Sequence, residues 1–120
     1  MQTPFRLTFR NVAHSDALAS HLEQRAQKLE HLHTGIISCH VVVELHGHHQ
    51  LGHDERYHFS INLGLPGREL VVNHPPSSDK GVLENAYRRA DDAFDELERQ
   101  LEDWVTRQRQ HRHDALATQR

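Results

Sequence analysis

Apolar and polar residues alternate in two parts of the chain, PFRLTFRNV and RYHFSINLG, which is the pattern of a half-buried β-strand. A third segment, IISCHVVVEL, is almost wholly apolar and rich in the β-branched residues that strands favour. A fourth, RELVVNH, ends at a pair of prolines, which cannot donate to a strand ladder. The four predicted strands are residues 4–12, 36–45, 56–64 and 68–74.

Two longer segments carry apolar residues at spacings of three and four, the period of an amphipathic helix. The first is expected to begin after Ser15, a good N-cap, with Asp16 in its first turn, and to end near Leu32. The second begins near Val82 and loses its periodicity near Gln110. The apolar stripes are Leu18, Leu22, Ala26, Leu29 and Leu32 in the first helix, and Leu83, Tyr87, Ala90, Phe94, Leu97, Leu101 and Trp104/Val105 in the second.

The predicted element order is β-α-β-β-β-α. The first β-α-β unit requires a right-handed crossover, which places the first helix on one face of the sheet. The second helix must cover the same apolar face, because the other face carries polar residues: Arg6, Arg10, Glu44, Arg56 and Asn62. The fold class is therefore α+β, a two-layer sandwich with a four-stranded mixed sheet and two helices on one face. We expect this domain to span residues 1–110 and residues 111–120 to form a disordered basic tail.

The composition narrows the classes of protein. At 120 residues the chain forms one domain, and its single cysteine, Cys39, excludes an intramolecular disulfide. No apolar run reaches the length of a membrane span, so we expect a cytoplasmic protein with no membrane partner. The formal net charge of −3 argues against strong non-specific binding to nucleic acid, although the 13 histidines add positive charge below neutral pH.

Catalytic and metal-binding motifs are weakly represented. The sequence has no Gly-rich phosphate loop, no HExxH motif and no serine elbow, so we expect neither an enzyme nor a small-molecule substrate nor a cofactor. Four histidines lie in the stretch ELHGHHQLGH and offer imidazole ligands for a metal ion, but glycine spacing in a hairpin tip does not preorganise them. This low-ranked alternative metal site consists of His46, His48, His49 and His53.

Three segments together resemble the ribosome hibernation-promoting factor / ribosome-associated inhibitor family, in a short form related to sigma-54 modulation proteins. The segments are residues 9–32, whose helix ends in a KLE-type sequence, the strand SCHVVVE, and the helix AYRRADDAFDELERQL with its Arg99-Gln100-Leu101 ending. The resemblance covers roughly residues 5–105. It implies a non-enzymatic protein that docks in the mRNA/tRNA channel of the small ribosomal subunit and silences idle ribosomes. Its partner would be ribosomal RNA, which requires cations that meet phosphates.

Basic and acidic residues of the first helix fall on opposite flanks, which gives that helix one basic side. With the resemblance, this side and the basic residues of the second helix become the expected rRNA contacts. They are Arg25, Lys28, Arg89, Arg99 and Arg107, with His21 and His31 as auxiliary contacts. Glu96, Glu102 and Asp103 stand where many family members have lysine or arginine, so we expect weaker binding than theirs.

A second hypothesis is a protein–protein adaptor. The open sheet face and the acidic surface of the second helix (Asp91, Asp92, Asp95 and Glu96) would then meet a basic partner, or the domain would self-associate weakly through an edge strand. The acidic run itself is typical of a solvated helix face. Co-sedimentation with small ribosomal subunits separates the two hypotheses, since an adaptor predicts none.

Overall fold

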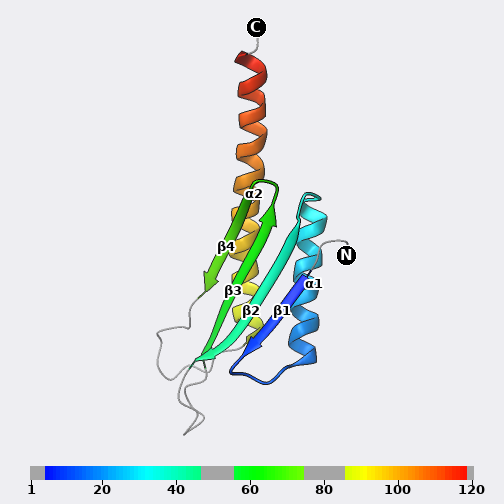
Figure 1. Cartoon of the computed structure of the whole chain (residues 1–120), viewed down its shortest axis with the longest axis vertical. Coiled ribbons are helices and arrows are strands. Elements are labelled where there is room, and N and C mark those ends of the chain that lie inside the picture. Colours follow the sequence, from blue (N-terminus) through cyan, green and yellow to red (C-terminus); the bar gives the residue numbers. More distant parts are fainter. Residues whose placement is uncertain (1–4, 47–55, 75–85, 119–120) are drawn as a thin grey trace.

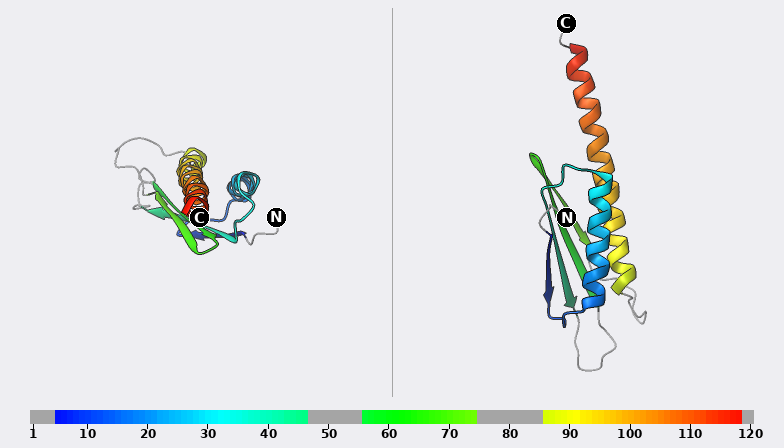
Figure 2. Two further views of the ribbon diagram at one scale, coloured as in Figure 1. Left: turned by 90° about the horizontal axis from the view of Figure 1, so that it is seen from above. Right: turned by 90° about the vertical axis from the view of Figure 1, so that its right-hand side faces the viewer.

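The computed structural model describes residues 5–46, 56–74 and 86–118 and has the predicted element order. The elements are β1 (Phe5–Arg10), α1 (Asp16–Leu32), β2 (Ser38–His46), β3 (Arg56–Leu65), β4 (Arg68–His74) and α2 (Ala86–Thr118). The strands form one sheet in the order β1-β2-β3-β4, with β1 parallel to β2 and the other pairs antiparallel (Figure 1). Both helices cover the same face (Figure 2). The predicted two-layer α+β sandwich is confirmed.

The start of α1 follows from its capping residue. The backbone N–H of Leu18 donates to Ser15 Oγ at 3.2 Å, which satisfies one of the amides that a helix leaves open at its N-terminus. Asp16 places a negative charge in the first turn, where it complements the helix dipole. At the other end, the N–H of His33 closes the last turn on Leu29 O. The predicted limits of this helix are therefore confirmed.

The β3–β4 hairpin turns at Pro66 and Gly67. Gly67 has a φ of 73°, which glycine adopts without steric cost, and proline sets the φ that the preceding turn position needs. This tight turn fixes the register of the hairpin, in which Leu63 lies opposite Leu70 and Ile61 opposite Val72. The large apolar residues Leu63, Leu70, Ile61 and Val72 consequently point to the helix-covered face, whereas Val71 of β4 is 52% exposed on the open face.

The core lies between the sheet and the two helices. Odd-numbered residues of β2 and β3 are buried there and even-numbered ones face the opposite side, as the alternation predicts. No polar or charged residue of the described segments is classed as fully buried. The largest fully buried side chains of the core are Phe59, Phe94, Leu22, Leu29, Ile61, Leu63, Leu97 and Leu101.

Two residues of the predicted apolar stripes lie at the surface, so their assignment to the core was wrong. Leu32 is 50% exposed in the last turn of α1, where it lines a shallow pocket together with Leu101 and Val105 of α2. Tyr87 is 41% exposed in the first turn of α2, and its ring packs edge-on against that of His21, with 5.3 Å between centroids. Both residues lie in terminal turns of their helices, and these contacts are with the other helix.

The C-terminal segment also differs from the prediction, because α2 continues through residues 111–118 to Thr118. Figure 1 shows this part of α2 projecting past the end of the sheet. The amphipathic pattern stops near Gln110 because no sheet lies beneath the helix there, not because the helix ends. No glycine or proline occurs in Ala86–Thr118, so nothing in the sequence terminates it.

Leu22 and Leu32 occupy the same predicted stripe and allow a matched test of the packing. Leu22 is 0% exposed. Leu22→Ala should lower the free energy of unfolding by about 2–5 kcal/mol, because it removes buried methyl groups and leaves a cavity. Leu32→Ala should change it by no more than about 0.5 kcal/mol. Urea unfolding followed by circular dichroism measures both, and equal losses would contradict the observed packing.

Candidate nucleic-acid interface

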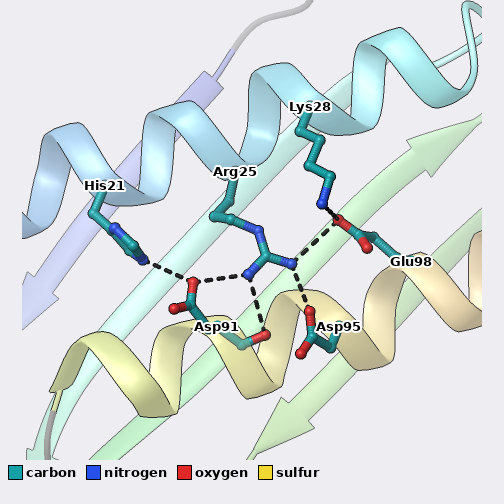
Figure 3. Close-up of polar contacts among 6 residues, drawn as sticks. All are labelled: His21, Arg25, Lys28, Asp91, Asp95 and Glu98. Atoms are coloured by element: carbon teal, nitrogen blue, oxygen red, sulfur yellow. Dashed lines mark hydrogen bonds and ion pairs between the residues drawn. The ribbon is translucent and has the colours of Figure 1, made fainter.

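The basic flank of α1 faces α2, not solvent. Basic residues recur on α1 at spacings of four and three, and acidic residues recur on α2 at the same spacings. Because the two helices run side by side in the same direction, the two rows meet in order (Figure 3). We call the six residues the charged seam: His21, Arg25 and Lys28 on α1, and Asp91, Asp95 and Glu98 on α2.

Arg25 is the centre of the charged seam. Its Nη1 donates to Asp91 Oδ1 at 2.7 Å, and its Nη2 donates to Asp95 Oδ1 at 2.8 Å and to Glu98 Oε1 at 3.2 Å. The side chain is only 15% exposed, and its Cζ lies 5.5 Å from the centroid of the Phe94 ring. Burial alone would lower the pKa of Arg25, but the hydrogen bonds to the carboxylates outweigh it and raise the pKa above its ordinary value. Arg25 therefore joins the helices as a permanent cation.

The two ends of the seam are weaker and more exposed. His21 Nε2 donates to Asp91 Oδ1 at 2.7 Å, and Lys28 Nζ lies 3.7 Å from Glu98 Oε1 with its side chain 60% exposed. Desolvation raises the pKa of Asp91, but the hydrogen bonds and charges of His21 and Arg25 outweigh it, so this pKa lies below its ordinary value. Two permanent cations thus face three carboxylates, and the seam carries no surplus positive charge for a phosphate.

The other predicted contacts are placed differently. Arg99 is 70% exposed and pairs with Glu96 of its own helix, with 2.6 Å between Nη2 and Oε2. Arg107 is exposed on the part of α2 beyond the sheet, and His31 is exposed in the last turn of α1. Arg89 is half-buried in the second turn of α2. The structure therefore brings together only His21, Arg25 and Lys28 among the predicted site residues.

The alternative metal site lies almost entirely outside the described residues. His48, His49 and His53 fall in 47–55, and His46 ends β2 with its side chain not described. Within residues 5–46, 56–74 and 86–118, no three histidine, cysteine, aspartate or glutamate side chains are grouped as metal ligands. The thiol of Cys39 is buried in the core, and burial raises its pKa to about 12, so it is protonated and inert at neutral pH.

The carboxylates of the seam are the functional residues that the sequence interpretation missed. Asp91 and Asp95 were assigned to a solvated helix face, yet they bind Arg25 across the helix interface. The signal was present in the sequence, because 91, 95 and 98 repeat the spacing of 21, 25 and 28. It becomes interpretable only when the two helices are known to lie parallel and adjacent, which the pattern along either helix does not reveal.

The fold and the seam define a small α+β sandwich with a charged helical layer and an open polar sheet face. The family described as sigma 54 modulation protein / S30EA ribosomal protein matches residues 5–109. The chain therefore belongs to this family of ribosome-associated factors, as its sequence resemblance predicted. No match was found among curated protein sequences.

Two solved structures share the fold. A ribosomal subunit interface protein from Coxiella burnetii is similar with a TM-score of 0.66 and 20% identity, covering 87% of this chain and 99% of that one. The N-terminal domain of Protein Y from Thermus thermophilus is similar with a TM-score of 0.65 and 24% identity, covering 86% of this chain and 99% of that one. Within the described residues, no helix has the length and apolar content that crossing a bilayer requires.

Removing the central cation of the seam should destabilise the protein. Arg25→Ala should lower the free energy of unfolding by about 2 kcal/mol, because it leaves partly buried carboxylates facing one another without their donor. Arg25→Lys keeps the charge and should therefore lose less stability than Arg25→Ala. It should still be less stable than the wild type, because a compact ammonium lacks the planar guanidinium fork that spans the three carboxylates. Arg99→Ala, at an exposed pair, is the matched control and should change little. Denaturant unfolding distinguishes the three variants. An Arg25→Ala protein as stable as the wild type would contradict the stabilising role of the charged seam.

The lowered pKa of Asp91 makes its contribution depend on pH. Since the folded pKa lies below the unfolded one, the stabilisation is fully present above the unfolded pKa and disappears as the pH falls through the folded pKa. The loss caused by Asp91→Asn should therefore be largest near neutral pH and shrink below about pH 4. Asp92→Asn, at an exposed neighbour on α2, is the control. A pH-independent loss for Asp91→Asn would contradict this assignment.

Proposed function

We propose that the protein binds the small ribosomal subunit in the channel used by mRNA and tRNA, and there keeps idle ribosomes silent in the cytoplasm. The observation that carries this proposal is the family match, which extends over residues 5–109 and so includes the whole sheet, all of α1, and α2 as far as Arg109. One structural relative is a ribosomal subunit interface protein, which supports a ribosomal partner. The domain acts by occupying space and binding rRNA, not by chemistry.

The exposed cations of the helical layer are the phosphate contacts on this side of the domain. Lys28, Arg99 and Arg107 have exposed side chains, and His31 adds an exposed imidazole at the end of α1. Arg25 and His21 act indirectly, because their hydrogen bonds to α2 hold the two helices at a fixed separation. A phosphate would have to displace carboxylates to reach Arg25, whereas it can approach Lys28 or Arg107 without breaking the centre of the seam.

Acidic residues on α2 limit the affinity of the domain for rRNA. Glu96 already accepts from Arg99, and Glu102 and Asp103 are exposed one turn further along the helix. These three carboxylates repel the same phosphates that the nearby arginines attract. Binding should therefore be weak for a protein of this size. It should decrease as salt rises, with a slope proportional to the small number of phosphate contacts.

Sedimentation of ribosomal subunits with the protein, at low and at physiological salt, tests the proposal. The protein should travel with the small subunit at low salt and dissociate as salt rises. The double variant Lys28→Ala/Arg107→Ala should reduce the slope of log affinity against log salt by about 1.5, because it removes two phosphate contacts. Arg68→Ala, an exposed arginine at the β3–β4 turn, is the control. Absence of the wild-type protein from the small-subunit fraction at low salt would refute the proposal and favour an adaptor.

A further inference from the structure

The open face of the sheet carries two arginines that the helical layer does not neutralise. Arg6 and Arg10 are exposed on β1, and they alternate with Phe5, Leu7 and Phe9, which pack against the core, so they lie on the face opposite the helices. Within the part of the chain that the structure describes, neither side chain makes a hydrogen bond or an ion pair. Arg6 and Arg10 are four positions apart on one strand, so their Cα atoms are separated by about 13 Å. They can therefore contact different phosphates of one nucleic-acid strand.

His40 of β2 lies beside this pair. Its Cα is in register with that of Arg6, and its Nε2 shares a hydrogen bond of 3.1 Å with Thr8 Oγ1. Desolvation and the positive charges of Arg6 and Arg10 together lower the pKa of His40. Two positive charges thus lie beside His40 at this edge, even though the net charge of the chain is −3. We call Arg6, Arg10 and His40 the β1 patch.

Negative charge on this face is placed to one side of the patch. Among the described residues of β1 and β2, Glu44 is the one carboxylate on the open face, in register with Arg10 on one side and His58 of β3 on the other. Glu69 lies on β4 at the opposite edge of the sheet, in register with Gly64 of β3. An anionic partner is therefore favoured along β1 and disfavoured along β4.

The remaining side chains of the face indicate how such a partner is recognised. The described open-face residues of β1 to β4 include hydroxyl and amide groups but no Phe, Tyr or Trp, so stacking of bases there is limited to the imidazole rings of His40 and His58. Hydroxyls and amides can bond to the 2′-hydroxyl and phosphate oxygens of RNA, whatever its sequence. These polar residues are Thr8, Ser60, Asn62 and Asn73.

We propose that the β1 patch is a second RNA-contact surface that binds the ribose-phosphate backbone, so that the domain contacts RNA with its open sheet face as well as with its helices. The inference rests on the proposed function for its biological partner, but its chemistry is independent of that function. Arg6 and Arg10 bind two phosphates, and Thr8 and Asn62 bond to the sugar and phosphate oxygens between them. The face selects RNA by backbone and shape, not by base sequence.

A short fluorescein-labelled oligouridylate is the probe, because it presents RNA backbone without a ribosome. Arg6→Ala/Arg10→Ala should weaken binding by at least about fivefold and lower its salt dependence, whereas Arg68→Ala should stay within about twofold of wild type. Glu44→Gln, which removes the nearest carboxylate, should tighten binding, and this opposite change cannot come from misfolding. Fluorescence anisotropy of the full chain measures all four proteins.

Nuclear magnetic resonance locates the surface. Amide shifts on adding the oligouridylate should cluster at residues 6–10 and 40–44, and the pKa of His40 should rise because a bound phosphate offsets the charges of Arg6 and Arg10. Shifts confined to α1 and α2, or equal affinities for wild type and Arg6→Ala/Arg10→Ala, would overturn the inference.

Sedimentation with small subunits separates this inference from the proposed function. If the double variant binds the oligouridylate normally but no longer sediments with subunits, the patch contacts a ribosomal protein and the RNA assignment is wrong. If wild type fails to sediment with subunits yet binds the oligouridylate through the patch, the proposed function fails and the inference stands.

Discussion

The contact between Arg25 and the three carboxylates of α2 determines how this domain presents its charge. One guanidinium, 15% exposed, reaches Asp91, Asp95 and Glu98 and lies over Phe94 in the core. Ion pairs at the surface contribute little, but a guanidinium that satisfies several carboxylates in a partly buried setting fixes geometry as well as energy. The helices are therefore joined in one register, and the most basic flank of α1 is used within the protein.

Because the carboxylates of α2 neutralise the basic flank of α1, the remaining positive charge of the domain lies on other surfaces. The exposed cations of the helical layer include Lys28, Arg99 and Arg107, and each of these lies near acidic residues. The open sheet face keeps Arg6 and Arg10, because the right-handed β1-α1-β2 crossover places α1 on the other side of the sheet and α2 packs on that same side. A protein with a net charge of −3 can thus belong to a ribosome-associated family, since its cations and carboxylates are segregated over its surface.

The architecture was accessible from the sequence because each element satisfies a local rule. Alternation at β1 and β3, the Ser15 cap and the Pro66-Gly67 turn each act over a few residues. Helix ends were less predictable. Leu32, in the last turn of α1, is half exposed although it continues the apolar stripe, and α2 continues beyond the sheet to Thr118. The charged seam was missed for a different reason. Arg25 and Asp91 are 66 residues apart in the chain, and their pairing depends on the lateral placement of two helices.

The structure of the protein bound to the small ribosomal subunit, determined by electron cryomicroscopy, tests the account most directly. We expect density for the protein in the mRNA/tRNA channel, with Arg25 still bonded to Asp91, Asp95 and Glu98. We also expect rRNA phosphates at Lys28, at Arg107 and at the β1 patch. Density that shows Arg25 on a phosphate with the seam broken would contradict the assignment of Arg25 as the residue that joins the helices. An empty channel under low salt would contradict the proposed function itself.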